Sequence, residues 1–304
     1  MKNFTILLFI FSFSLWAAQE KTIHVDGSMS HAKNWMEYTA SEELNIQKLL
    51  EILARSQTGS ELIAKAQAKA QSGGKRLLEV IKAGEGSLTD TTLVRKFSPE
   101  TPDQVEYETR SIVYINRTHP WDDALLDLAH ELTHFVYRDG FNPYADSFNV
   151  KDFIKSTIEG KGGEAQAFIV ECKVLSELFK SGSAQGRTHC QSIRDEHGQI
   201  SANRAVELFY HIGPYFETFH KQLSIRKVRE EFSYLKPGKI NFISSAYGLP
   251  YPVAALMEFD LVMNKVCEND RKRLAFYATD AGRKPAAASS THPTFVQTYH
   301  NRCK

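Results

Sequence analysis

An apolar segment between residues 118 and 140 constrains the fold more than any other part of the sequence. Its apolar side chains recur at helical spacing, with Thr118 as a candidate N-cap. Asp122 and Asp123 stand near its start, where acidic groups favour a helix, and Gly140 follows its end, as glycine often does. The sequence therefore predicts a helix of about five turns whose apolar surface packs against a core.

Residues 130 to 134 of this helix read HELTH. His130 and His134 are one turn apart and project from one face, so both imidazoles can reach one metal ion. Glu131 lies about 100° around the helix, where it can contact a water on zinc and take its proton as the water attacks a carbonyl. The alternative is an amphipathic helix with unrelated polar residues, but two histidines without a role are costly in so apolar a segment.

The segment LAHELTHF, residues 128–135, resembles the active-site helix of zincin metallopeptidases. In that clan the strand before the helix often belongs to a sheet whose edge holds an extended substrate, and SIVYIN precedes the helix at a comparable place. The resemblance implies a zincin-like fold and the hydrolysis of peptide bonds in a peptide or protein substrate. It also implies Zn²⁺ as the cofactor, His130 and His134 as metal ligands, and Glu131 as the catalytic base.

The third metal ligand distinguishes groups of zincins. A metzincin would continue as HExxHxxGxxH, but FVYRDG follows His134, so that group is excluded. Gluzincins take a glutamate from a second helix, and Glu164 opens a predicted helix 30 residues after His134, among small residues similar to those of gluzincin ligand helices. The resemblance implies Glu164 as the third ligand. Glu159 and Glu171 stay open as alternatives, and so does a Glu164 carboxylate that only favours the helix start.

Two parts of such a site have no assigned residue. Thermolysin-like enzymes orient the first histidine with an aspartate four residues after the ligand glutamate, but Phe168 stands there. Asp127, one turn before His130, is a candidate for that role. A donor is also needed to stabilise the developing oxyanion, and the candidates are Tyr247, Tyr251, His211, His220 and His292.

The remaining patterns predict an α+β fold, with a small mixed sheet in the first half of the chain and a mainly helical second half. Strands are expected where β-branched and aromatic residues gather, over residues 91–97 and 105–116. The segment SSAYGLPYP, residues 244–252, reads as a loop. Further helices are predicted over residues 41–55, 60–71, 162–180, 201–223 and 254–267.

The N-terminus has the order of a secretory signal peptide: Lys2, an apolar run over residues 4–16, then two alanines. A signal peptide over residues 1–18 leaves one domain, 19–304, in which residues 19–40 form a pro-segment or linker. Residues 41–150 then carry the strands and the HELTH helix, and 151–304 form a helical subdomain with the glutamate ligand. The protein is expected to be secreted or periplasmic and not inserted in a membrane; an uncleaved anchor or a buried N-terminal segment is the alternative.

Cysteine usage and charge narrow the compartment and the partners. The four cysteines are an even number without CxxC spacing, so two disulfides fit an oxidising compartment. Three connectivities are possible, and proximity favours Cys172–Cys190 and Cys267–Cys303; free thiols are the alternative. A net charge of +1 gives no electrostatic footprint for nucleic acid, which is excluded as a partner. The sequence leaves the oligomeric state undefined.

Two other functional classes are compatible with the same motif. One is a catalytically degenerate zincin-like protein that acts as a binding module, which the phenylalanine at position 168 favours. The other is a zinc hydrolase that acts on cell-wall peptide or amide bonds. A purely structural zinc site is disfavoured, because such a site needs no base like Glu131 and closes its fourth position with a protein ligand.

Overall fold

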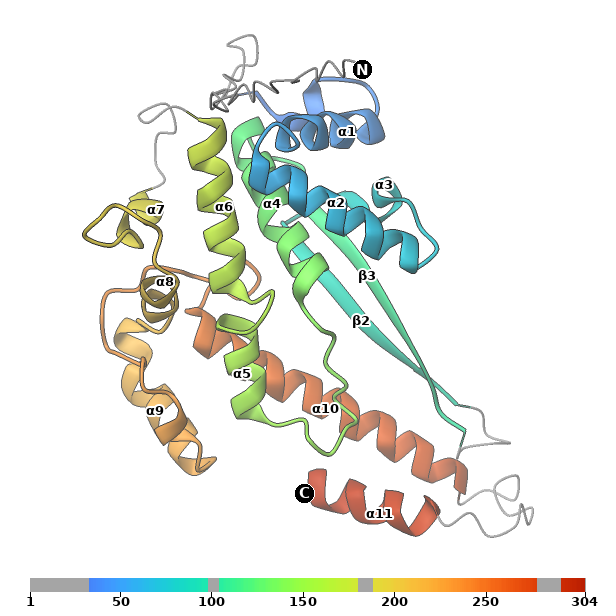
Figure 1. Ribbon diagram of the computed structural model, residues 1–304. Helices are drawn as coiled ribbons and strands as arrows, with labels where there is room; N and C mark the ends of the chain where they lie inside the picture. Colours follow the sequence, from blue (N-terminus) through green and yellow to red (C-terminus); the bar gives the residue numbers. More distant parts are fainter. Residues whose placement is uncertain (1–32, 98–103, 180–187, 278–290, 304) are drawn as a thin grey trace, which may run out of the picture.

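The computed structural model describes residues 33–97, 104–179, 188–277 and 291–303 (Figure 1). Within these ranges the chain has the predicted α+β fold, with one three-stranded sheet in the first half and a mainly helical second half. The predicted signal peptide and most of the expected 19–40 segment lie outside the described residues. No helix among the described residues is long and apolar enough to cross a membrane.

The sheet has the strand order β1 (Ile81–Gly84), β3 (Glu106–Asn116), β2 (Leu88–Lys96). β1 runs parallel to β3, and β2 runs antiparallel to it. The segment SIVYIN belongs to this sheet, as its place before the helix predicted, and it lies in the central strand β3. β2, which begins three residues earlier than predicted, is the edge strand that lies beside the HELTH helix.

The HELTH helix is α4 (Trp121–Tyr137), and most of its surface is buried as predicted. Thr118 is not its cap: Pro120 occupies the N-cap position, and the Thr118 hydroxyl donates to Asn116 Oδ1 (2.8 Å). α4 packs against β3 and against α1 (Glu42–Leu53) and α2 (Gln57–Ser72), and the side chains of these elements form the first hydrophobic core. The predicted helices over 41–55 and 60–71 are confirmed.

A second core joins α5 (Val150–Ile158), α6 (Glu164–Leu178), α8 (Ala202–Phe209), α9 (Phe216–Ile225) and the start of α10 (Tyr251–Tyr277). α6 contributes to both cores and lies beside α4 (Figure 1). The short elements of the described residues are η1 (Trp35–Glu37), α3 (Leu77–Val80), α7 (Thr188–Ser192), η2 (Gly213–Tyr215) and η3 (Arg229–Glu231), and α11 (Thr291–Arg302) lies near the C-terminus.

Two helix predictions in the second half need correction. The stretch 201–223 is not one helix, because it breaks between α8 and α9 at Gly213, whose positive φ of 52° does not fit helical geometry. α10 begins at Tyr251, three residues earlier than predicted. Tyr251 is therefore held on a helix and does not lie in the predicted loop.

Both disulfides are present with the connectivity that proximity favoured, Cys172–Cys190 and Cys267–Cys303, and no cysteine among the described residues is free. The first ties α7 to α6, and the second ties the end of α11 to α10. Disulfides persist in oxidising compartments, so this pairing fits an extracellular or periplasmic environment.

A buried ion pair joins the edge strand to the far part of α10. Arg95 of β2 binds Asp270 of α10, with side chains 5% and 1% exposed. The Arg95 guanidinium also stacks over the Tyr144 ring, 4.1 Å from its centroid, and Arg302 of α11 approaches the second oxygen of Asp270 (3.6 Å). The Arg95–Asp270 pair thus connects β2 with α10 at some distance from α4 (Figure 1).

Removing one partner of this buried pair should be strongly destabilising. Asp270→Asn leaves Arg95 charged, buried and without its counter-ion, which typically costs about 3–5 kcal/mol of unfolding free energy. Urea denaturation under oxidising conditions measures the loss. The control is Asp260→Asn on the same helix, which breaks an exposed pair with Arg226 and should cost at most about 1 kcal/mol. Equal effects of the two substitutions would contradict this account of the buried pair.

Candidate metal centre

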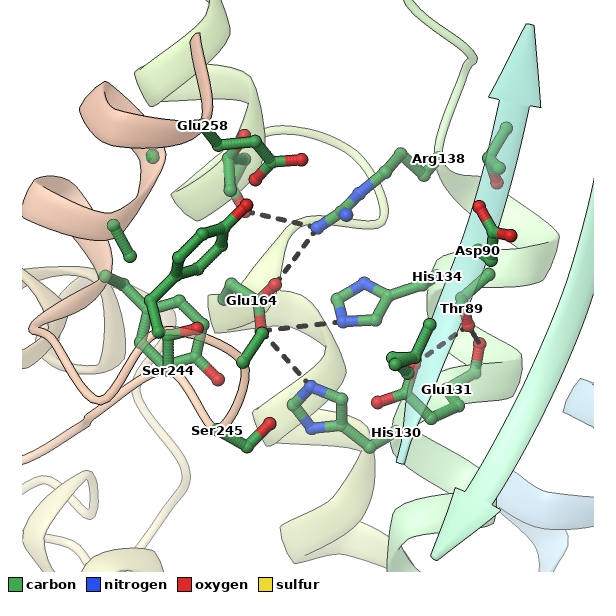
Figure 2. A pocket seen from close by; sticks show the side chains of 18 of the residues that line it. Thr89, Asp90, His130, Glu131, His134, Arg138, Glu164, Ser244, Ser245 and Glu258 are labelled. Carbon is green, nitrogen blue, oxygen red and sulfur yellow. Dashed lines mark hydrogen bonds and ion pairs between the residues drawn. The ribbon is translucent and has the colours of Figure 1, made fainter. Parts of the chain in front are cut away.

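His130, His134 and Glu164 converge from two helices into a group that could hold a metal ion. One ligand atom from each lies within 4.8 Å of the other two. Glu164 Oε2 is 3.3 Å from His130 Nε2 and 3.5 Å from His134 Nε2 (Figure 2). The structure therefore brings the three expected ligands together, and neither Glu159 nor Glu171 belongs to the group. Glu159 instead accepts a hydrogen bond from the Tyr210 hydroxyl (3.0 Å).

The donor atoms fit a tetrahedral metal site with one open position. Zinc bonds of about 2.0–2.1 Å at tetrahedral angles would separate neighbouring ligand atoms by about 3.4 Å. The two N···O separations, 3.3 and 3.5 Å, are close to this value, and the ligand nitrogens of the two histidines lie within 4.8 Å of each other. Two imidazoles and a carboxylate suit zinc and several other divalent transition metals. Among the described residues no fourth His, Cys, Asp or Glu joins the group, which is the ligand count of a catalytic site.

A glycine turn before α6 sets the position of Glu164. Gly162 has a φ of 68°, and a Cβ added there would lie 2.3 Å from the backbone nitrogen of Arg138. Only glycine lets this turn pack directly against the end of α4. The Gly162 carbonyl accepts a hydrogen bond from His134 Nδ1 (2.8 Å). Because a carbonyl can only accept, Nδ1 carries the hydrogen and the lone pair of Nε2 is free to face a metal.

Glu171 orients the first histidine. Its Oε2 lies 3.3 Å from His130 Nδ1, whereas Glu164 Oε2 faces Nε2 of the same ring. Glu171 is two turns after Glu164, so both point from α6 toward α4. In thermolysin-like enzymes an aspartate four residues after the ligand glutamate contacts the first histidine. Here the residue that contacts His130 is Glu171, seven residues after Glu164. Phe168, at the fourth position, packs against Phe242 in the second core (4.7 Å between ring centroids).

Asp127 does not orient His130, so that prediction is wrong. Its Oδ2 accepts a hydrogen bond from Ser87 Oγ (2.5 Å) and pairs with His119 Nε2 (3.0 Å). Burial opposes ionisation of Asp127, but the His119 and Ser87 contacts hold its pKa below the usual value. Through its contact with Ser87, Asp127 therefore stabilises the segment that leads into β2.

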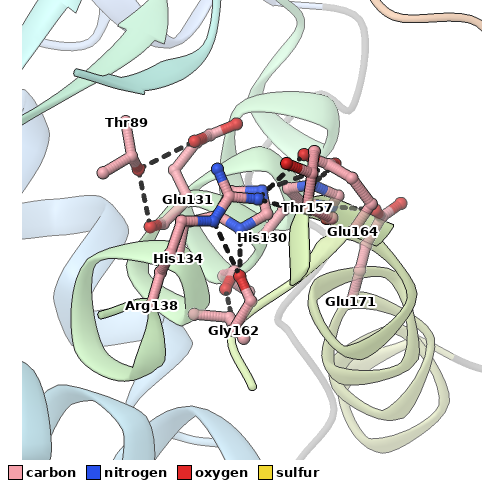
Figure 3. A network of polar contacts seen from close by, with 11 residues as sticks. Thr89, His130, Glu131, His134, Arg138, Thr157, Gly162, Glu164 and Glu171 are labelled. Carbon is pink, nitrogen blue, oxygen red and sulfur yellow. Dashed lines mark hydrogen bonds and ion pairs between the residues drawn. The ribbon is translucent and has the colours of Figure 1, made fainter. Parts of the chain in front are cut away.

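Arg138 holds the outer oxygen of the glutamate ligand. Its Nη2 lies 3.2 Å from Glu164 Oε1 and 3.4 Å from the Thr157 carbonyl, and its Nε donates to the Gly162 carbonyl (3.3 Å) (Figure 3). Burial opposes ionisation of Glu164, yet His134, His130 and Arg138 hold the pKa of this carboxyl well below its usual range. Oε1 is thus engaged by the guanidinium, and Oε2 is left on the side of the histidines.

Glu131 is buried beside the open position and is held by the edge strand. The Thr89 hydroxyl of β2 lies 2.8 Å from Glu131 Oε2 and 2.8 Å from the Glu131 carbonyl (Figure 2). Burial raises the pKa of Glu131, although His134 and His130 oppose the rise. A carboxylate with a raised pKa next to an open position is suited to proton transfer. Sequence reasoning missed Thr89, because the predicted strand began after it.

Two cavities, of about 350 and 520 Å³, meet at this group. The first lies between the start of β2 and the start of α10, and its lining includes Arg138, Phe141, Phe153 and Glu258. The second is bordered by side chains of the second core and by His119 and His189. The residues common to both cavities are Ser87, His130, Glu131, Ser245 and Tyr251.

Of the candidate oxyanion donors, Tyr251 lies at the meeting point of the cavities. Burial and the nearby Glu164 and Glu131 raise its pKa well above the usual value, so its hydroxyl keeps its proton. Tyr247 lines only the first cavity. His211 packs against Gly238 and His220 stacks on Phe216, and neither lines either of these two cavities. The side chain of His292 is outside the described part of the chain.

Glu171→Gln should weaken metal binding by about 10- to 100-fold, the usual effect of losing a carboxylate that orients a ligating imidazole. Asp127→Asn is the control, because it removes a carboxylate one turn from His130 on the same helix that binds Ser87 and His119 instead. Competition with a chromophoric chelator measures zinc affinity for both variants. Weaker binding in Asp127→Asn with unchanged binding in Glu171→Gln would refute this assignment.

Comparison with known proteins adds no assignment to this geometry. No known protein family, no curated protein and no solved structure matches the chain. The resemblance to zincins therefore rests on the HELTH segment itself, together with the convergence of His130, His134 and Glu164 that the structure adds.

Proposed function

We propose that this protein is an exported zinc-dependent metallopeptidase that hydrolyses peptide bonds in a peptide or protein substrate. One observation carries the proposal: two histidines of one helix and a glutamate of another form a three-ligand group beside a buried carboxylate, Glu131. Export is supported by the two disulfides and by the predicted signal peptide.

The residues around the group have separate tasks in this reaction. When bound, zinc would polarise the substrate carbonyl and make a water more acidic. Glu131 accepts the proton of the attacking water and delivers it to the leaving amine. Thr89 holds the Glu131 carboxylate in place, 2.8 Å away. Tyr251, protonated at the meeting point of the cavities, donates to the oxygen on which negative charge develops.

The free edge of β2 suits an extended substrate. Residues 87–91, which include the start of β2, run from the junction of the two cavities along the first cavity. A peptide added to this edge would find the metal group beside its middle and a cavity on either side. A cleft that extends in both directions fits a bond inside a chain better than a small isolated amide.

Two features of the site weaken the hypothesis of a degenerate binding module. That hypothesis was based on two missing features. Position 168 has no aspartate to orient His130, and no residue had been assigned as the donor to the oxyanion. The contact of Glu171 with His130 supports the first role for Glu171, and the position of Tyr251 in the lining of both cavities supports the second for Tyr251. No specific contact favours cell-wall peptide or amide bonds over other peptides, so peptide hydrolysis is the function that the geometry supports best.

Zinc content and peptide hydrolysis test the proposal together. The wild type should bind about one zinc per chain and cleave peptides. Glu131→Gln should keep its zinc and lose about 10²- to 10⁴-fold in rate, whereas Glu164→Ala should lose zinc. Glu159→Gln is the control for the ligand assignment and should keep its zinc. Full zinc in Glu164→Ala would refute that assignment, and undiminished hydrolysis by Glu131→Gln would refute the mechanism.

Tyr251→Phe should lower kcat by about 10²- to 10³-fold with little change in KM, because the donor acts on charge that appears only in the transition state. Tyr247→Phe removes a hydroxyl from the same cavity wall and should leave kcat within about twofold. Steady-state kinetics on one cleaved peptide, with zinc content verified for each variant, separates the two. A larger loss of kcat in Tyr247→Phe would assign the role to Tyr247 instead.

A further inference from the structure

One face of α10 forms a wall of the first cavity. Tyr251, Ala254, Ala255 and Glu258 line it, and this spacing places all four on one side of the helix. The two alanines leave space between the tyrosine and the glutamate. Glu258 lies two turns beyond Tyr251, about 10 Å along the helix axis. Figure 2 shows the Glu258 carboxylate on the α10 side of the cavity and Asp90 of β2 on the other.

The Glu258 carboxylate has no direct partner in the part of the chain that the structure describes. It is only partly exposed, and among the described residues it makes no hydrogen bond and no ion pair within 4 Å. Burial raises its pKa against the opposing effect of Arg138. By contrast, Asp90 accepts a hydrogen bond from Thr92 (2.9 Å) and Arg138 is engaged by Glu164. A partly buried carboxylate without a partner is stabilised when a cation or donor arrives.

The rest of the cavity suits a cation on an apolar stem. Beyond the three ligands and Glu131, its carboxylates are Asp90, Asp139 and Glu258 and its one guanidinium is that of Arg138. Phe141 and Phe153 lie in the same lining, and aromatic side chains accommodate both the methylenes and the charge of a lysine or arginine. The cavity is therefore complementary to a long basic side chain.

The direction of β2 tells which side of the scissile bond this cavity serves. Antiparallel pairing is the more stable arrangement for an added strand. A substrate antiparallel to β2 places its N-terminal part beside Thr91, along the first cavity, and its C-terminal part beside Glu85 and Ser87, along the second. The first cavity thus receives residues on the N-terminal side of the bond.

We propose that Glu258 determines specificity by pairing with a cationic group of the substrate on the N-terminal side of the scissile bond. This inference rests on the proposed peptidase function. The cation is an ammonium or guanidinium within about three residues of the bond, since an extended chain rises about 3.3 Å per residue. A lysine or arginine side chain and a free N-terminal amine both supply this chemistry, and the experiment distinguishes them.

The test compares paired peptides with the wild type, Glu258→Gln and Glu268→Gln. Each pair differs only in carrying lysine or norleucine before the cleaved bond, and is made with a free and with an acetylated N-terminus. Glu268 is an exposed acid of the same helix, paired with Lys272, and serves as the matched control. Glu258→Gln should lose about tenfold in kcat/KM for lysine peptides, the scale of one charge pair, and little for norleucine peptides.

The outcomes separate the sources and decide the proposal. A preference for lysine over norleucine that depends on Glu258 and survives acetylation identifies the side chain. A preference for free over acetylated peptides that depends on Glu258 in both series identifies the terminal amine. Equal kcat/KM for all peptides, or a preference unchanged in Glu258→Gln, overturns the proposal.

If the wild type cleaves none of the peptides, that result contradicts the proposed function, and the subsite is tested by peptide binding instead. Affinities of the same peptides are then measured with the zinc-loaded Glu131→Gln variant, with and without Glu258→Gln. Tighter binding of the cationic peptides that depends on Glu258 supports the subsite. Equal binding, or none, overturns it.

Discussion

The packing of the Gly162 turn against the end of α4 is the contact on which the site depends. It brings a carbonyl to His134 Nδ1 (2.8 Å) and places Glu164, two residues later, beside both histidines. Arg138, from the end of α4, closes the same contact by binding the Gly162 carbonyl and the outer oxygen of Glu164. One close backbone approach, possible only for glycine, therefore sets the tautomer of one ligand and the position of another.

The site lies where the two hydrophobic cores meet, because α6 belongs to both. Its first turns, including Ala165 and Phe168, pack into the second core, and its last turns, including Val174 and Leu178, pack into the first. Glu171 comes between these sets and faces His130. Because α6 packs into both cores, Glu164 and Glu171 are both held on one rigid helix.

Much of this arrangement could be predicted from the spacing of residues along the chain, whereas the rest depends on tertiary contacts. The period of α4 and the HELTH spacing are properties of a single helix, so both could be read from the sequence. The pairing of Glu171 with His130, and of Asp127 with Ser87 and His119, depends on how separate elements pack and leaves no local pattern. Which strand forms the edge beside α4 also could not be predicted, since strand order within a sheet depends on tertiary pairing.

The walls of the cleft are fixed to each other as well as to the site. β2 contributes Thr89 next to Glu131 and, six residues further on, Arg95, which is buried against Asp270 of α10. α10 begins with Tyr251 at the junction of the cavities and is held to α11 by the disulfide of Cys267. The strand that would pair with a peptide and the helix that would read its side chains are therefore joined beyond the first cavity. Because that joint is buried and cross-linked nearby, the spacing between these walls is set before any substrate binds, as preorganised recognition requires.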